Sequence, residues 1–569
     1  MTSTKDLSLA FTFIQGLLVV IFGAISVYAM TRCVYLLYFH PLSRYPGPKV
    51  AAASNIWYAY HWISGRYPWE TEKVLRKYGD VVRIAPNELL FIRPQAFADI
   101  YTPHVKNHEL FVKTEINDRG DKTGGIAFER DPVRHREVRK QLSPAFSSRS
   151  ITAKEPVMHK YIDLFVERMK AIGAVSEGVD LAQWCNWVAM DISADMTYNR
   201  EMNQVRDMKN SVYMNVLLGF NQFTTIEQVS FRFPFMKRFR KLFLPISAMT
   251  SIPKMIQISR AELHRRLCQK GSTQHPDFFE QIVPANGVPV SSWFYGTLMN
   301  LLAEPEICEK LTQEIRANFQ SYNDIRPVDL KPLQYLNACI QESLRVFPSN
   351  NLGLPRISPG AEVDGTYTPK GVYCQTSMFA MWRSPYYFHD PLRFRPQRWL
   401  PKNHPLYESK FSEDCLEGSH PMGQGLRVCI GKEVAWRITR LFIAKVFWTF
   451  DLVKVPGREL DFEKDFITYG FWSKPVLRAR FVSIVLIVRH YFGSMVSGAM
   501  GLRGTTTTGD SGCSCQGIDP GLCVWRQYHF HYLTAEAVCA KPHRHLLATY
   551  LRPCMLLAAS TLLTTLPKT

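Results

Sequence analysis

Hydrophobic positions along this chain form one long uninterrupted run near the N-terminus and then shorter runs of helix or strand length. Residues 7–30 include no charged residue, and as a helix they span roughly 30 Å of hydrocarbon. The run is too long for a secretory signal peptide, and no small-residue cleavage site follows it. Arg32, Arg44 and Lys49 come after the run. The pattern predicts a transmembrane anchor at 7–30 that leaves the rest of the chain in the cytosol.

The shorter runs predict the elements of the body behind this anchor. Lys77–Pro94 reads as two strands around a turn at Pro86 and Asn87. Leu336–Val346 and Lys432–Phe447 read as helices. Between anchor and body, the prolines at 40–48 predict a rigid connector. We therefore expect a hinge over 31–50.

One cysteine in a glycine-rich stretch carries the clearest chemistry. Cys429 lies between Gly425 and Gly431, and Arg427 precedes it by two residues. Glycines let the backbone pass close to a flat ligand, and the N-terminus of the helix that follows favours a thiolate. A thiolate bound to haem iron favours O–O cleavage. The alternative is a buried free cysteine in a turn, but the spacing G-x-R-x-C-x-G favours a haem ligand.

Two motifs upstream strengthen this interpretation. Glu342 and Arg345 are spaced i,i+3 on a predicted helix, and Arg398 lies in the stretch Phe394–Trp399. An isolated E-x-x-R motif could be an exposed ion pair worth roughly a few tenths of a kcal/mol. The three motifs in this order resemble the cytochrome P-450 family. The resemblance implies that Glu342, Arg345 and Arg398 form a buried triad that locks the core beside the haem loop.

The resemblance also implies a fold and a set of partners. It predicts a mainly α-helical domain with small β-sheets over 51–481, the cytochrome P-450 fold, preceded by one transmembrane helix. The cofactor would be haem b (iron protoporphyrin IX) with Cys429 as the axial iron ligand. Electrons would come from an NADPH-cytochrome reductase, and O2 and a lipophilic molecule would be the substrates. The amino-acid sequence of the hinge resembles that of fungal microsomal members. This resemblance implies that the protein lies in the endoplasmic reticulum membrane and contacts its lipid.

Four further residues are expected to bind the cofactor. Asp131–Phe146 reads as the start of a basic helix and resembles the family helix with W-x-x-x-R, in which His135 replaces Trp and Arg139 holds the Arg position. An exposed basic helix face is the alternative. Arg356 matches the family strand whose Arg contacts a propionate, and Arg427 would be a partner within the haem loop.

The chain departs from the family in two places. Met422 stands where the family usually has Phe, so we expect weaker shielding of the thiolate rather than loss of haem. Near 283–291 the long helix that carries the acid and alcohol of the proton relay is shortened. Residues 288–290 (Val, Pro, Val) cover those positions, and neither Val nor Pro can serve as a general acid.

Ser291 is the nearest hydroxyl and a weak catalytic candidate. Three interpretations stay open: a truncated or mis-spliced product, which we favour; a less effective relay through water and Ser291; or chemistry that needs less proton relay. In the substrate territory over 151–266, Met214, Phe220 and Phe223 could line the pocket, although apolar residues at helical spacing are most often core.

Composition narrows the function classes. The net charge is +19, but no long Lys/Arg block or nucleic-acid motif accompanies it, so we expect no nucleic-acid partner. A basic face for an acidic reductase and anionic lipid fits better. The 13 cysteines include no C-x-x-C pair, which argues against a zinc site or redox dithiol. The tail over 482–569 resembles nothing in the family, and we expect it to be disordered.

The sequence therefore predicts a fungal haem-thiolate monooxygenase that oxidises a lipophilic secondary metabolite, a polyketide, terpenoid or alkaloid. One alternative is a catalytically impaired relative that still binds haem. The other is a haem-dependent isomerase or ring-rearranging enzyme.

Overall fold

The computed structural model describes residues 4–102, 110–115, 126–127, 129–233, 288–349, 351, 353–457 and 459–484, with scattered residues between 253 and 268. Several sequence-based predictions lie outside these described residues. They concern the side chains of Phe220 and Phe223, the segment 283–287 and the tail from residue 485. The expected disorder of the tail therefore stays a prediction from residue 485 onward, but it is wrong for Val482 and Ser483, which pair with Asp451 and Phe450 in the strand Arg478–Ser483.

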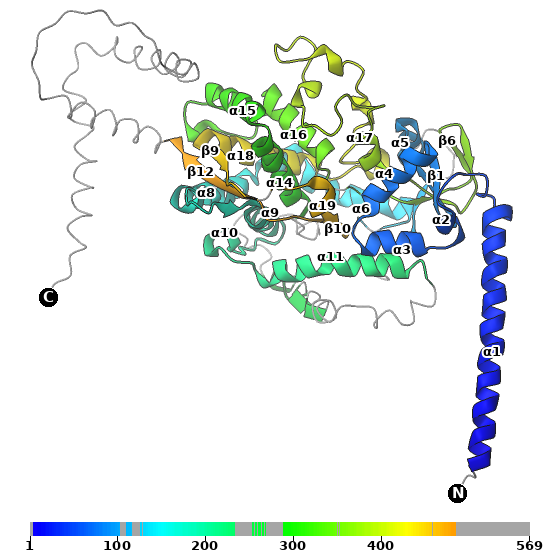
Figure 1. Cartoon of the computed structure of the whole chain (residues 1–569). Helices are drawn as coiled ribbons and strands as arrows, with labels where there is room; N and C mark the ends of the chain where they lie inside the picture. The colour runs from blue at the N-terminus through cyan, green and yellow to red at the C-terminus, as the bar shows by residue number, and fades with distance from the viewer. Residues whose placement is uncertain are drawn as a thin grey trace, which may run out of the picture. The chain divides into compact units, whose positions relative to one another are not determined.

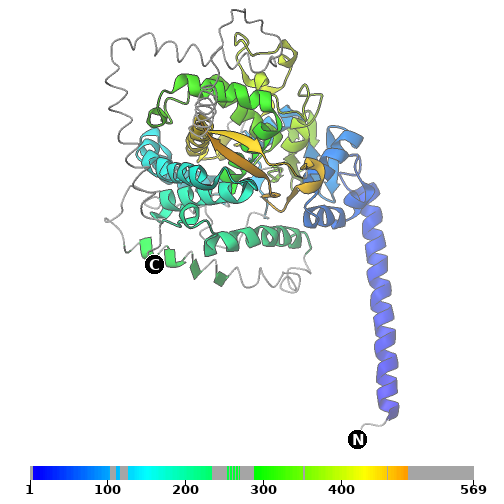
Figure 2. The same cartoon turned by 60° about the vertical axis from the view of Figure 1, so that its left-hand side comes forward.

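The described chain is mainly α-helical with small β-sheets, which confirms the predicted fold class (Figures 1 and 2). The described helices are α1 (Thr4–Val34), α2 (Lys49–Ala53), α3 (Ile56–Ile63), α4 (Tyr67–Tyr78), α5 (Pro94–Tyr101), α6 (Pro132–Leu142), α7 (Ser148–Thr152), α8 (Glu155–Ile172), α9 (Leu181–Tyr198), α10 (Gln204–Asp207), α11 (Val212–Ser230), α14 (Val288–Ala303), α15 (Pro305–Asn318), α16 (Gln334–Val346), α17 (Met378–Trp382), α18 (Lys432–Thr449) and α19 (Phe462–Asp465).

The strands form one five-stranded sheet and three smaller ones. The larger sheet has the order β1-β2-β8-β5-β3, and the others are β10-β11, β4-β12-β9 and β6-β7. The strands are β1 (Val81–Ala85), β2 (Glu88–Phe91), β3 (Val112–Lys113), β4 (Val179–Asp180), β5 (Arg356–Ile357), β6 (Ala361–Val363), β7 (Thr366–Thr368), β8 (Tyr373–Thr376), β9 (Phe450–Lys454), β10 (Ile467–Thr468), β11 (Trp472–Ser473) and β12 (Arg478–Ser483).

Most sequence-predicted elements are present. The turn at Pro86 and Asn87 joins β1 and β2 as an antiparallel pair. Helices α16 and α18 match the two predicted runs to within two residues at each end. Helix α6 begins after Asp131, whose side chain accepts the Val133 N–H and so satisfies one of the free donors of the first turn. Local capping and periodicity therefore set these boundaries.

Helix α1 contains the apolar run and is exposed from Phe11 onward. Within the described residues, Phe11–Phe39 is the one stretch of helix long and apolar enough to cross a membrane. The chain then joins the body at Leu36, which is buried and whose carbonyl accepts Arg83 Nη1 at 2.8 Å. The end of the apolar segment is thus bonded to the larger sheet.

The main hydrophobic core surrounds α14. This helix packs against α9, α16 and α18, and Phe294 stacks on Phe442 of α18 with ring centroids 4.2 Å apart. It has 16 residues, about 24 Å at 1.5 Å per residue. In the described part of the chain it begins at Val288, next to the segment where the sequence predicts a shortened helix.

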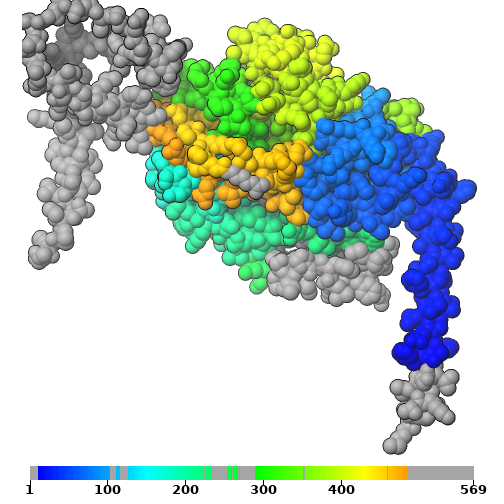
Figure 3. Space-filling view, in the orientation of Figure 1, coloured from blue at the N-terminus to red at the C-terminus, as the bar shows by residue number. Residues whose placement is uncertain are grey.

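The N-terminal helices meet the C-terminal strands on one side of the body. Figure 3 shows the blue N-terminal part in contact with the orange segment before residue 484. The Gly65 carbonyl accepts the Thr468 N–H at 3.0 Å, and Arg66 Nη1 donates to the Phe466 carbonyl at 2.9 Å. Hydrogen bonds therefore join the N-terminal and C-terminal parts of the body.

Candidate haem-thiolate site

The cysteine loop is shaped by a short turn and the start of α18. Gly425–Arg427 form a 3-10 turn, and α18 begins at Lys432. The Cys429 N–H donates to the Met422 carbonyl at 2.9 Å. Gly425 has φ +68°, and a Cβ there would lie 2.5 Å from the Tyr101 carbonyl oxygen. Only glycine fits this approach of the loop to the end of α5.

Burial and neighbouring groups shift the pKa of the Cys429 thiol in opposite directions. The residue is exposed, yet the surrounding loop desolvates the sulfur enough to raise the pKa of the thiol above its ordinary value of 9.0. A hydrogen bond from the Gly431 N–H and the charge of Arg139 lower that pKa. The free thiol is therefore protonated at neutral pH, and a metal ion that binds it displaces the proton.

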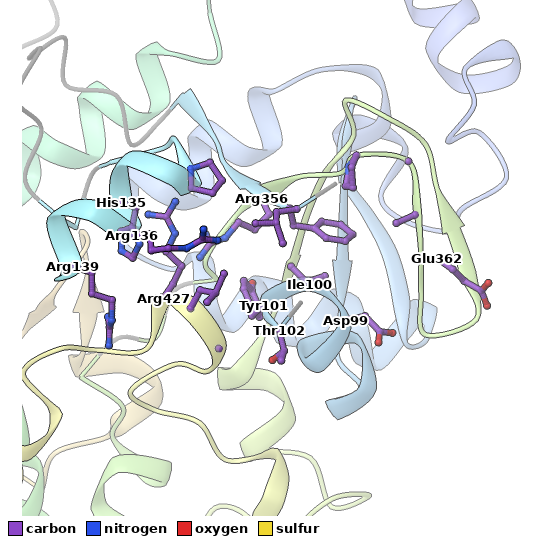
Figure 4. A pocket seen from close by; sticks show the side chains of 18 of the residues that line it. Asp99, Ile100, Tyr101, Thr102, His135, Arg136, Arg139, Arg356, Glu362 and Arg427 are labelled. Atoms are coloured by element: carbon purple, nitrogen blue, oxygen red, sulfur yellow. The ribbon is translucent and has the colours of Figure 1, made fainter. Parts of the chain in front are cut away.

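Cationic side chains gather beside this loop. A cavity of about 930 Å³ is lined by His135, Arg136 and Arg139 of α6, Arg356 of β5 and Arg427 of the loop. Figure 4 shows these groups at one end of the cavity and the carboxylates of Asp99 and Glu362 at the other. Cys429 is not one of the residues that line this cavity. The sequence analysis missed Arg136, which lies one residue after His135.

Backbone carbonyls hold these cations in place. Arg427 donates to the carbonyls of Glu129 and Arg130 at 2.6 and 3.1 Å. Arg139 Nη1 donates to the Val428 carbonyl at 2.8 Å, which ties α6 to the residue before Cys429. The arginines are therefore positioned by neutral acceptors, and their charges are not cancelled by these bonds.

Burial and repulsion between neighbouring cations lower the pKa values of Arg427 and His135. Burial, followed by the charge of Arg356, lowers the pKa of Arg427 to about 10. Burial, followed by Arg427, lowers the pKa of His135 to about 4, so this imidazole is neutral at pH 7. A buried concentration of positive charge is costly unless an anion neutralises it. The cluster therefore fits a ligand that carries carboxylates.

The residues present fit haem on two counts. They supply a thiolate donor suited to iron and, next to it, cations suited to propionate carboxylates. Among the described residues, no group of three or more His, Cys, Asp or Glu side chains could hold a metal ion. A ligand set made wholly of protein side chains is thus not found in the described part, whereas a single thiolate is sufficient for haem iron.

The predicted triad is assembled in the core. Arg345 forms two hydrogen bonds to Glu342, at 2.7 and 2.9 Å, and Arg398 Nε forms a third at 3.1 Å. All three side chains are fully buried. Burial alone would raise the pKa of Glu342, but Arg345 and Arg398 outweigh it and hold the pKa below its ordinary value of 4.5. The carboxylate is therefore charged and saturated with donors.

The structure shows further partners of the triad that no sequence motif predicted. Arg398 also pairs with Asp414, and Trp399 Nε1 donates to Glu342 at 2.8 Å. Arg345 donates to the carbonyls of Trp382 and Pro391, each at 2.6 Å. Asp414 lies 16 residues beyond Arg398 in irregular chain, so no local periodicity could have identified it. The triad fixes the whole segment before the cysteine loop.

Ser291 occupies a different environment. It is buried in the first turn of α14, and its Oγ accepts Lys474 Nζ at 2.9 Å. Lys474 also donates to Asn186 Oδ1 at 2.6 Å, and burial lowers its pKa to about 8. Ser291 is not one of the residues lining the cationic cavity. Met214 is buried in α11.

Comparisons with known proteins identify the family of this chain. The sequence profile of the family described as cytochrome P-450 matches residues 48–286 and 289–475, and the match is interrupted beside the start of α14. Cytochrome P-450 monooxygenase TwmD of Talaromyces wortmannii is 49% identical over 493 residues, which cover 82% of this chain and 96% of the relative.

More distant relatives carry the same description. Cytochrome P-450 monooxygenase poxC of Penicillium oxalicum is 34% identical over 478 residues, covering 80% of this chain and 93% of the relative. Cytochrome P-450 monooxygenase btcC of Colletotrichum orbiculare is 32% identical over 495 residues, covering 82% of this chain and 93% of the relative.

Proposed function

Because the chain belongs to the cytochrome P-450 family of haem oxidoreductases, we propose that Cys429 is the axial ligand of a haem b and that Arg139, Arg356 and Arg427 hold its propionates. The observation that carries this proposal is the placement of Cys429 and Arg427 on one loop that Arg139 bonds to α6. His135 is neutral and buried, so its role is to pack against the cofactor edge and offer one hydrogen bond.

The bound haem would supply oxygen activation, which no side chain provides. The protein would orient it and control its surroundings. The Gly431 N–H, with Arg139, stabilises negative charge on the sulfur. The triad of Glu342, Arg345 and Arg398 holds the chain before the loop so that the sulfur keeps its position. Met422 packs against the main core, which supports an apolar shield for the thiolate.

The substrate and the electron donor are inferred at family level. We assign a monooxygenase that inserts one oxygen atom from O2 into a lipophilic secondary metabolite, with electrons from NADPH through a reductase. Support comes from the fungal relatives, each described as a monooxygenase. The net charge of +19 favours an acidic redox partner.

We place the protein in the endoplasmic reticulum membrane with its body in the cytosol. Helix α1 fits a single anchor. Helix α3, which follows the hinge, is apolar on both faces. Tyr58 and Trp62 are buried, while Ile56, Tyr60 and Ile63 are each more than half exposed. An outward apolar stripe of this kind, close in sequence to an anchor, is suited to a lipid surface.

The shortening that the sequence predicts near 283–291 favours a second candidate, a relative that binds haem but activates oxygen poorly. The family match is interrupted between residues 286 and 289, and Ser291, the nearest hydroxyl, is occupied by Lys474. Turnover with NADPH and reductase separates the candidates, because an impaired relative binds haem and yields no oxidised product. Incorporation of labelled oxygen into product would exclude an isomerase.

The direct test of the proposal is the carbon-monoxide difference spectrum of the reduced full-length protein. Wild type is expected to show the long-wavelength Soret band of a thiolate-ligated haem, and Cys429→Ala to lose it. Cys415→Ala is the matched control, since Cys415 lies 14 residues earlier and is not in the haem loop. A colourless wild type, or an unchanged Cys429→Ala spectrum, would refute the assignment.

A further inference from the structure

One lysine stands opposite Arg356 in the larger sheet, and no motif assigns it a role. Lys113 is in β3, where it stands directly opposite Arg356 of β5 in antiparallel register. Like charges directly opposite on an antiparallel pair are destabilising. Arg356 is buried, and Lys113 is partly buried. The residues just before β3, Leu110 and Phe111, line the same cavity as the arginines, so β3 forms part of its wall.

The surroundings of the Lys113 amine are dominated by positive charge. Its Nζ donates to the Ala127 carbonyl at 2.6 Å. Burial, followed by the charges of Arg427 and then Arg356, lowers its pKa to about 7, while Glu129 alone acts in the opposite direction. Lys113 in turn contributes to the low pKa of His135. Without an added anion, this amine is therefore close to half neutral at pH 7.

We propose that Lys113 is a positioning residue of the cofactor site: it takes up a proton when carboxylates neutralise Arg356 and Arg427, and then holds a positive charge close to the cofactor. This inference rests on the proposed haem function. It assigns Lys113 an electrostatic role exerted through the arginines, since its own amine is directed to the Ala127 carbonyl.

The proposal has a consequence for the reduction potential. A carboxylate pair beside Arg356 and Arg427 offsets the repulsion that disfavours charged Lys113, so its pKa rises on cofactor binding. A fixed positive charge near the haem stabilises the reduced state, which carries one more negative charge than the oxidised state. Lys113 therefore raises the midpoint potential of the haem at every pH at which its amine is protonated.

The test is the midpoint potential of the full-length holoprotein in nanodiscs, measured by spectroelectrochemistry from about pH 6 to about pH 9. Wild type is compared with Lys113→Met, which removes the charge, and Lys113→Arg, which keeps it. Lys140→Met is the matched control, because it removes the same charge from an exposed position on α6. No substrate is needed.

We expect Lys113→Met to lower the potential at neutral pH and Lys113→Arg and Lys140→Met to leave it close to wild type. The wild-type potential should fall toward that of Lys113→Met as pH rises and Lys113 loses its proton, whereas Lys113→Arg stays charged. Equal potentials for wild type and Lys113→Met, or an arginine variant that behaves like the methionine variant, would overturn the proposal.

The following results separate a failure of the Lys113 assignment from a failure of the proposed function, even if one variant misfolds. Should Lys113→Met yield no holoprotein, the slopes of potential against pH for wild type and Lys113→Arg decide, and parallel slopes contradict the role of Lys113. A wild type that binds no haem refutes the proposed function itself. A normal Soret band with unchanged potentials refutes only the assignment of Lys113.

Discussion

At the scale of single residues, the site depends on charges that are buried only because their partners are fixed. Glu342 accepts from two guanidinium groups, the Arg395 N–H and the Trp399 indole. The E-x-x-R spacing predicted the first partner, because i,i+3 residues share a helix face. Arg398 came from the family resemblance, and its pairing with Asp414 came only from the structure. A carboxylate with this many donors is sensitive to loss of its charge.

Glu342→Gln is expected to destabilise the protein by about 3–5 kcal/mol, because it removes the counter-ion of buried Arg345 and leaves buried Arg398 with Asp414 alone. The thermal midpoint of unfolding and the yield of haem-loaded protein should both fall. Glu70→Gln is the control, since Glu70 pairs with Lys73 at the exposed surface of α4 and should cost less than about 1 kcal/mol. Equal losses in the two variants would contradict a special role for the triad.

At the scale of elements, α18 is fixed to α8 by a polar cluster under its apolar face. Lys445 is buried, and its Nζ contacts both His159 Nδ1, at 2.8 Å, and Asp163. Tyr322 also donates to Asp163. An ammonium group can only donate, so His159 accepts at Nδ1 and is neutral. Because α18 follows the cysteine loop, this cluster fixes the direction in which the loop leaves the core.

The neutral state of His159 predicts acid sensitivity. Burial and then Lys445 lower the pKa of His159 below 6.5, so the unfolded chain binds this proton at a higher pH than the folded protein does. The neutral imidazole of His159 therefore contributes stability to the folded protein above about pH 6.5, and this contribution is lost as the pH falls toward the pKa of His159 in the folded protein. His159→Gln keeps an acceptor and cannot be protonated, so its thermal midpoint should fall less between pH 7 and pH 5.

A control variant isolates this effect. His389→Gln changes an imidazole whose side chain is about half exposed (49%), and it should retain the pH dependence of wild type. If His159→Gln and wild type lose the same number of degrees on acidification, the cluster does not carry the linkage.

At the scale of the whole molecule, the exposed apolar side chains of α3, at the N-terminal end of the body, are suited to contact with lipid. The outward stripe of α3 has no charged side chain and follows the hinge after α1. Leu36 and Arg83 bond that hinge to the larger sheet. An anchor formed by α1 would therefore hold the body near the membrane, with α3 available for contact with lipid.

A fluorescent amino acid introduced in place of Tyr60 is expected to be quenched by brominated lipids in nanodiscs that contain the full-length protein. The same probe in place of Tyr386, which is 85% exposed and far from α3 in sequence, should not be quenched. A blue-shifted but unquenched probe at position 60 would mean that another segment of the chain covers α3. Equal quenching at both positions would exclude a specific membrane face.

The sequence by itself determined several elements and the family, and it singled out the loop around Cys429 as the candidate thiolate loop. Local periodicity placed the β1–β2 pair, α16 and α18, because side-chain spacing and capping act within a few residues. The order of three motifs indicated the family, which the comparisons confirmed. These are properties of short stretches, and each can be read along the chain.

Only the tertiary structure decided which charges share a space. Arg136, Arg356 and Arg427 come from segments up to about 290 residues apart, yet they line one cavity. Lys113 opposes Arg356 through a strand register, and Lys474 takes the hydroxyl of Ser291. Burial and repulsion between groups distant in sequence lower the pKa values of Arg427 and Lys113, and these energies exist only once packing has removed the water between the groups.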